Sequence, residues 1–226
     1  MKKHNIFIAC DTNNISKVLK IIKHTKTKKL NIGYKFGLEF FYSPKGRPFI
    51  SKLKRKRIFL DLKLNDIPNT CRSAINSIKD LKQVGYITVH TNGGLEMMRA
   101  IKKVSGKIKV LGVTTLTSLN NNALRKIGFN KKLNKLVKLQ AKLAKLAGLD
   151  GIVCSALEAK HLKKICKDME IVTPGIRLEG ENAEDQKRIA TPKIAFKNGA
   201  TSIVIGRSIT KGSIKKNLNK LIASLN

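Results

Sequence analysis

Short apolar runs alternate with amphipathic segments along the whole chain. The apolar runs are rich in Ile, Val, Leu and Phe, a composition that is typical of buried strands. This pattern predicts strands over residues 6–10, 31–36, 57–64, 85–90, 107–113, 150–154, 170–173 and 200–205.

The segments between these runs repeat apolar residues every three to four positions, as a helix with one buried face does. They predict helices over residues 14–23, 38–53 with a break at 44–46, 73–84, 95–104, 132–147, 157–166, 191–198 and 214–225. Regular alternation of strands and helices favours an α/β fold, a closed (β/α)8 TIM barrel that forms a single domain over residues 1–226. A doubly wound open sheet is the alternative.

The composition adds one unusual feature, a net charge of +33. So strong a positive charge could indicate a protein that binds nucleic acid. The basic residues, however, recur on one predicted helix after another and do not gather in one patch, which favours compositional bias. We therefore expect no specific nucleic-acid partner, and only a weak, salt-sensitive attraction to polyanions. The basic segment 132–147 is interpreted as an outer helix of the barrel, not as a membrane-surface helix.

The remaining features of the sequence predict a cytoplasmic protein without membrane contact. The first apolar run ends at Asp11 and is too short for a signal peptide or a membrane span. The four cysteines form no C-x-x-C pair and no His lies clustered with them, so neither disulfides nor a zinc site is predicted. Neither the dinucleotide-binding glycine motif nor a P-loop is present, which argues against the usual nucleotide-binding folds.

The most informative stretch is the third predicted strand with the turn behind it, residues 57–70. Asp61 and Lys63 share one face of this strand, whereas four aliphatic residues share the other. An acid and a base side by side are expected at the open end of a barrel or sheet, where ligands bind. Asp66 follows, and Pro68 favours a helix start. The alternative is an ordinary strand end with a solvated ion pair and a helix cap.

In a barrel, the residues at the carboxyl ends of all strands meet at one mouth. The other polar positions expected there are Asp11, Lys35, His90, 114–118, 174–177 and 206–207. The last two groups each combine glycine with arginine after adjacent strands. Glycine lets backbone N–H groups approach anionic oxygens, and arginine adds a charged clamp, so these groups predict a phosphate site.

The sequence D-L-K-L-N-D-I-P-N-T at residues 61–70 resembles the signature of the orotidine 5′-phosphate decarboxylase family, and the resemblance extends over residues 6–210. The D-x-K-x-x-D core alone would fit a wider group of sugar-phosphate enzymes on this fold. The continuation I-P-N-T makes the match specific. The resemblance implies a cofactor-free carbon-carbon lyase that converts orotidine 5′-phosphate into uridine 5′-phosphate in de novo pyrimidine biosynthesis.

The resemblance also implies roles for individual residues. Lys63 would protonate the pyrimidine carbon that loses its carboxylate, Asp61 and Asp66 would lie near that carboxylate, and Lys35 would order the ribose and the charged groups. The implied substrate-binding residues are Asp11 at the ribose, Thr117 with Ser118 beside it at the base, and Pro174, Arg177, Gln186, Gly206 and Arg207 around the phosphate. In this family Asp66, with Ile67 and Thr70, is donated to the partner's active site, which implies a homodimer with shared sites.

Two alternatives remain open. One is a related sugar-phosphate lyase or decarboxylase that uses the same D-x-K-x-x-D core with a magnesium ion, because an enediolate intermediate needs a divalent metal. The other is a cationic binding protein on a barrel that has lost its activity. The charged residues of the core and the two glycine-arginine groups are all present, which argues against the second alternative.

Overall fold

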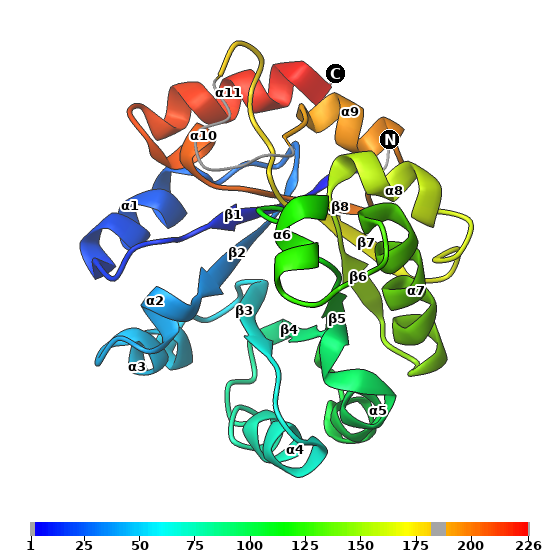
Figure 1. The fold of residues 1–226 in the computed structure, drawn as a ribbon. Helices are drawn as coiled ribbons and strands as arrows, with labels where there is room; N and C mark the ends of the chain where they lie inside the picture. Colours follow the sequence, from blue (N-terminus) through cyan, green and yellow to red (C-terminus); the bar gives the residue numbers. More distant parts are fainter. Residues whose placement is uncertain (1–2, 182–188, 226) are drawn as a thin grey trace.

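A computed structural model of the chain describes residues 3–181 and 189–225. In this part of the chain, eight parallel strands form a closed barrel in sequence order, surrounded by helices (Figure 1). The strands are β1 (Asn5–Ala9), β2 (Asn31–Gly37), β3 (Ile58–Leu64), β4 (Val84–His90), β5 (Lys109–Val113), β6 (Gly151–Val153), β7 (Glu170–Thr173) and β8 (Ser202–Ile205). The predicted barrel is confirmed, and the alternative of an open sheet is wrong.

The helices follow the predicted order, with three differences. They are α1 (Ile15–His24), α2 (Leu38–Phe41), α3 (Gly46–Lys52), α4 (Pro68–Asn76), α5 (Gly94–Val104), α6 (Asn121–Lys126), α7 (Leu133–Leu146), α8 (Ala156–Leu162), α9 (Pro192–Lys197), α10 (Arg207–Thr210) and α11 (Ile214–Leu225), with a 3-10 turn η1 (Thr91–Gly93). The short helices α6 and α10 were not predicted. The helix predicted over 73–84 is wrong in its limits, because α4 begins at Pro68 and ends at Asn76.

The residues after α4 explain this error. Ile78 and Leu81 continue the helical spacing and are buried. Their backbone N–H groups, however, donate to carbonyl groups three residues back, at 3.2 Å for Ile78 and 3.0 Å for Leu81. The chain therefore passes through tight turns that bury apolar side chains at helix-like intervals without forming an α-helix.

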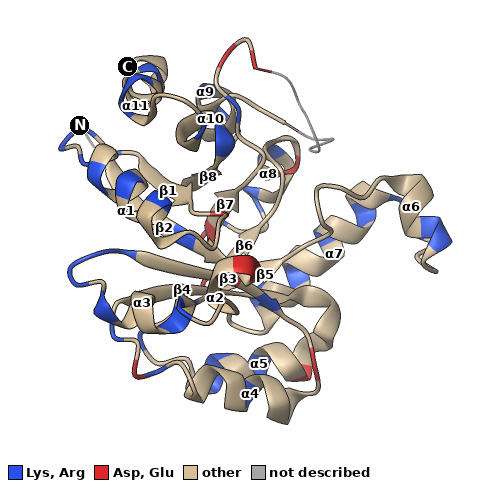
Figure 2. Ribbon diagram, turned by 90° about the vertical axis from the view of Figure 1, so that its left-hand side faces the viewer, with Lys and Arg blue, Asp and Glu red and all other residues tan. Residues whose placement is uncertain are grey.

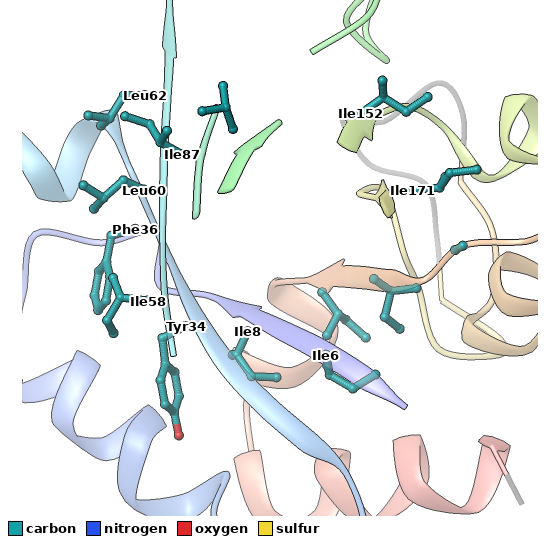
Figure 3. Packing of buried hydrophobic residues seen from close by; sticks show 14 of the residues in the cluster. Ile6, Ile8, Tyr34, Phe36, Ile58, Leu60, Leu62, Ile87, Ile152 and Ile171 are labelled. Atoms are coloured by element: carbon teal, nitrogen blue, oxygen red, sulfur yellow. The ribbon is translucent and has the colours of Figure 1, made fainter. Parts of the chain in front are cut away.

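Period-two alternation along the strands produces two hydrophobic layers. The outward-facing strand residues pack against the helices (Figure 3), and those labelled there are Ile6, Ile8, Tyr34, Phe36, Ile58, Leu60, Leu62, Ile87, Ile152 and Ile171. The inward-facing residues fill the barrel and are Phe7, Ala9, Phe59, Tyr86, Leu111, Val172 and Val204. The aliphatic face predicted for β3 is thus the helix-facing side, and the face with Asp61 and Lys63 belongs to the barrel interior and its mouth.

Local sequence explains several element boundaries. Asn14 caps α1, since its side-chain oxygen accepts the backbone N–H of Lys17 at 3.0 Å. Ser155 and Glu158 form a reciprocal capping box at the start of α8. In β2, a side chain at Gly33 would lie 2.7 Å from the ring of Phe7, so only glycine fits between this strand and the barrel interior.

Lysine and arginine are spread over most of the helices, and acidic residues are few (Figure 2). This distribution agrees with the interpretation of the charge as a general property of the surface. No helix within residues 3–181 and 189–225 is both long and apolar enough to cross a membrane.

Candidate active site

A pocket of about 310 Å³ opens at the carboxyl ends of the strands. Its floor is apolar and is formed by inward-facing strand residues such as Ala9, Phe59 and Val204. One part of its wall carries the charged residues on or just after β1 to β3, and the segments after β7 and β8 form the neighbouring part of the wall, beside Asp11. This is the position at which a barrel holds its ligand.

Four charged side chains line one side of the pocket in alternating order, and we call them the charged array: Asp11, Lys35, Asp61 and Lys63. The Nζ of Lys35 lies 3.0 Å from Asp11 Oδ1 and 3.3 Å from Asp61 Oδ2. The Nζ of Lys63 lies 2.9 Å from Asp61 Oδ1. The structure therefore brings together, within one chain, four of the residues that the sequence predicted at the mouth.

Mutual attraction keeps the inner members of the array charged. Burial alone would raise the pKa of Asp61, but the ammonium groups of Lys35 and Lys63, with hydrogen bonds from Lys63 and Thr88, hold it below its ordinary value. Burial alone would lower the pKa of Lys35, but Asp61 and Asp11 hold it above its ordinary value. Both partners therefore remain ionised around neutral pH.

The backbone of β3 is irregular where it carries the array. Lys63 has a φ of +50°, a left-handed conformation that is unusual for a residue with a side chain. The register of β3 with β4 changes here, since Leu60 pairs with Ile87 while Leu64 pairs with Val89. Three residues of β3, 61–63, thus lie opposite the single residue Thr88. The periodicity of the sequence did not predict this bulge.

The part of the pocket wall next to Asp11 contains the predicted phosphate-binding residues Pro174, Arg177, Gly206 and Arg207. Gly175 has a φ of +73°, which glycine adopts without steric cost. The guanidinium of Arg177 is buried, and its Nη1 donates to the carbonyl of Ile176 at 3.1 Å. Gln186, also predicted here, lies outside the described residues.

A third part of the pocket is formed by the segment after β5, which includes Thr117 and Ser118. The buried side chain of Gln140 on α7 anchors this segment. Its Oε1 accepts the backbone N–H of Thr115 at 2.9 Å, and its Nε2 donates to Asn92 at 2.8 Å. Sequence reasoning missed Gln140. Its position on the apolar face of an otherwise basic helix was the available signal.

Two predicted site residues lie away from this pocket. Asp66 and Thr70 are exposed, and neither lines the pocket of its own barrel. Asp66 Oδ1 accepts the backbone N–H of Ile67 at 2.7 Å, and the side chain of Ile67 is 65% exposed. A carboxylate and a large apolar residue thus project from the surface at the start of α4.

His90 ends β4 but does not line the pocket. Burial, with a contribution from the Lys63 ammonium, lowers the pKa of His90, so the imidazole is neutral at pH 7. Its Nδ1 is buried and finds no hydrogen-bond partner among the described residues. Within the same residues, no group of three or more His, Cys, Asp or Glu side chains is arranged to hold a metal ion.

Comparison with known proteins identifies the family. Residues 4–217 match the model of the orotidine 5′-phosphate decarboxylase / HUMPS family. The chain belongs to this family. It is 45% identical over 213 residues to an orotidine 5′-phosphate decarboxylase from Wolbachia pipientis, covering 92% of each chain. A relative of the same name from Bacillus anthracis is 42% identical over 219 residues, which cover 92% of this chain and 90% of the relative.

Solved structures of this family have the same fold. An orotidine 5′-phosphate decarboxylase from Lactobacillus acidophilus is 34% identical, with a TM-score of 0.84 over 99% of this chain and 100% of the other. The orotidine 5′-monophosphate decarboxylase from Methanocaldococcus jannaschii, complexed with the inhibitor BMP, is 23% identical and has a TM-score of 0.76 over the full length of both chains. The likeness to this second structure concerns the fold alone.

Proposed function

We propose that this protein decarboxylates orotidine 5′-phosphate to uridine 5′-phosphate in pyrimidine biosynthesis, as a carbon-carbon lyase of its family. The observation that carries the proposal is the charged array at the mouth of the barrel, in a chain that belongs to this family. We also infer a cytoplasmic location and a single domain over residues 1–226.

Lys63 is the proton donor of the proposed reaction. The bond between the pyrimidine carbon and the carboxylate breaks, carbon dioxide leaves, and the electron pair stays on the ring carbon. The ammonium group of Lys63 transfers a proton to that carbon and takes up a new proton from water afterwards. This assignment is supported by the position of Lys63 in the pocket wall, with its Nζ held 2.9 Å from Asp61.

Repulsion between Asp61 and the substrate carboxylate also favours the loss of carbon dioxide. Two unit charges about 4 Å apart interact by roughly 4 kcal/mol at an effective dielectric near 20, which corresponds to about three orders of magnitude in rate. Enzymes accelerate slow reactions by far more than this. Stabilisation of the developing carbanion by the Lys63 cation therefore makes the larger contribution.

The other pocket residues bind the substrate. Asp11 and Lys35 contact the ribose, Thr117 with Ser118 beside it reads the pyrimidine, and the segments after β7 and β8 hold the phosphate. Phosphate binding there is supported by the arrangement of Pro174, Arg177, Gly206 and Arg207 around one side of the pocket. Gln186 completes this group in the proposal. The reaction as proposed requires no cofactor and no metal ion.

We further propose a homodimer in which Asp66 and Thr70 enter the active site of the partner subunit. Both residues are exposed and lie outside the pocket of their own barrel. The apolar side chain of Ile67 beside them is 65% exposed, as expected of a residue that is buried by a second subunit. A two-fold axis would give two equivalent shared sites.

The proposal is tested by following the absorbance of the pyrimidine ring while purified protein is mixed with orotidine 5′-phosphate. We expect stoichiometric formation of uridine 5′-phosphate at an undiminished rate in excess EDTA. Loss of turnover in EDTA, with recovery on adding magnesium, would favour a metal-dependent sugar-phosphate lyase of the same family. Absence of turnover under both conditions would exclude the proposed function.

A further inference from the structure

Thr88 connects two members of the charged array without lining the pocket. It lies on β4 and is fully buried, with a relative exposure of 0%. Its hydroxyl donates to Asp61 Oδ1 at 2.9 Å and accepts the backbone N–H of Lys63 at 2.9 Å. A threonine hydroxyl has one proton to donate and lone pairs to accept, so both interactions occur together.

These two hydrogen bonds occur where β3 lacks regular pairing. Residues 61–63 lie opposite Thr88 alone, and Lys63 has a φ of +50°. A left-handed backbone is unfavourable for a residue with a side chain, so surrounding contacts must maintain it. The Thr88 hydroxyl provides one such contact, because it binds the N–H group of the strained residue itself.

Thr88 also restricts the carboxylate that Lys63 contacts. Asp61 Oδ1 accepts a proton from Thr88 at 2.9 Å and lies 2.9 Å from the Lys63 ammonium. The other oxygen, Oδ2, lies 3.3 Å from Lys35. Because Thr88 is β-branched and buried, its side chain has few rotamers and keeps its hydroxyl in place. One rigid group therefore fixes both the backbone of Lys63 and the carboxylate that orients its ammonium group.

We propose that Thr88 is a positioning residue for the proton donor. Its hydroxyl holds the bulge at 61–63 and the Asp61 carboxylate in the geometry that aims Lys63 at the reacting carbon. This inference rests on the proposed decarboxylation. Thr88 makes no contact with substrate in this role, and it acts through Lys63 and Asp61.

The test compares three variants with the wild-type enzyme. Thr88→Val removes the hydroxyl and keeps the shape of the side chain, and Thr88→Ser keeps the hydroxyl. Thr91→Val is the matched control, because Thr91 is 1% exposed and its hydroxyl donates at 2.9 Å to the backbone carbonyl of Val113, which is not a member of the array. We would measure kcat and KM for orotidine 5′-phosphate, the Kd of uridine 5′-phosphate and the melting temperature.

We expect kcat of Thr88→Val to fall by about 10- to 100-fold, the effect of losing a hydrogen bond to a charged, positioned group. The Kd of uridine 5′-phosphate should stay within about threefold of wild type, because no proposed binding contact is removed. Thr88→Ser should keep kcat within about threefold. Thr91→Val should lower the melting temperature as much as Thr88→Val while leaving kcat unchanged.

The inference is overturned if Thr88→Val keeps the wild-type kcat, if Thr88→Ser is as slow as Thr88→Val, or if Thr91→Val is equally slow. Should Thr88→Val fail to fold, Thr88→Ala takes its place in the same comparison with Thr88→Ser. If the wild-type enzyme turns over orotidine 5′-phosphate and Thr88→Val is equally active, only the positioning role of Thr88 is excluded. An inactive wild type excludes the proposed function and this inference together.

Discussion

Charged residues gather at both ends of the barrel, but those at the mouth line a pocket and those at the opposite end lie over aromatic rings. At the mouth, the charged array lines a pocket of about 310 Å³. At the opposite end, Arg57 lies 4.4 Å from the ring centroid of Phe7 and donates to Asn5 at 2.9 Å. There Glu170 contacts Lys109 and accepts the hydroxyl of Tyr86.

The difference lies in what the charges face. The lower cluster, which we define as Arg57, Tyr86, Lys109 and Glu170, covers the aromatic rings of the barrel interior. Its charged groups pair with one another and with the strand ends. The array at the mouth faces an open space that fits a ligand. Ion pairs of similar composition therefore stabilise the barrel at one end and are available for chemistry at the other.

The largest expected effect comes from removing the lysine at the mouth, and the same substitution in the lower cluster is its control. Lys63→Ala should lower kcat by about four orders of magnitude or more, because it deletes both the proposed proton donor and the cation proposed to stabilise the developing carbanion. Binding of uridine 5′-phosphate should change little. Lys109→Ala, the same substitution in the lower cluster, should leave kcat unchanged. Steady-state kinetics of both variants test the comparison, and full activity of Lys63→Ala would refute the mechanism.

The phosphate side of the mouth should give the next largest effect. Arg207→Ala should lower kcat/KM for orotidine 5′-phosphate by about 100- to 1,000-fold, since a charge-assisted contact to phosphate is lost. Turnover of orotidine, which has no phosphate, should change little. Arg47→Ala is the matched control, because Arg47 forms an exposed ion pair with Asp80 at 2.8 Å. An equal loss on both substrates would mean that Arg207 has a structural role.

Mixed dimers test whether the mouth is completed by a second subunit. Lys63→Ala and Asp66→Ala should each be inactive, and refolding them together should restore roughly a quarter of wild-type activity. The reason is that random pairing makes about half of the dimers mixed, and each mixed dimer has one intact site. Activity near zero, with mixed dimers demonstrated by mass spectrometry, would mean that Asp66 serves its own barrel.

The smallest effect on activity is expected in the lower cluster. Arg57→Ala should lower the free energy of unfolding by about 1–3 kcal/mol, because it loses a cation–π contact and two hydrogen bonds. For a chain of this size that corresponds to a decrease of roughly 3–10 °C in Tm. The kcat should not change. A loss of kcat without a loss of Tm would show that the lower cluster contributes to catalysis.

The sequence predicted the barrel because its signals are local and repeated. The limits of β7 and α11 agree with the expected ones, since each apolar pattern stops where the element stops. The charged array was also predictable, because Asp61 and Lys63 share a strand face and Asp11 and Lys35 lie at strand ends. The limits of α4 were not, because tight turns bury Ile78 and Leu81 at helix-like spacing.

The features that sequence reasoning missed depend on contacts between segments far apart in the chain. Thr88 binds residues 25 and 27 positions away, and Gln140 binds Thr115 from 25 positions away. No local pattern encodes such pairings. The bulge at 61–63 likewise arises only when β3 pairs with β4. A partial signal existed, since Tyr86, Thr88 and His90 share the inward face of one strand and lead toward the mouth.

The left-handed backbone of Lys63 means that activity and stability make opposite demands at this position. Glycine is the residue that a φ of +50° favours, yet in the proposed mechanism a lysine is needed here to supply the proton. Among inactive variants, Lys63→Gly should therefore be more stable than Lys63→Ala by about 1 kcal/mol. In the proposed mechanism, a lysine at this position therefore lowers the stability relative to glycine and supplies the proton donor, which is a trade-off between stability and activity.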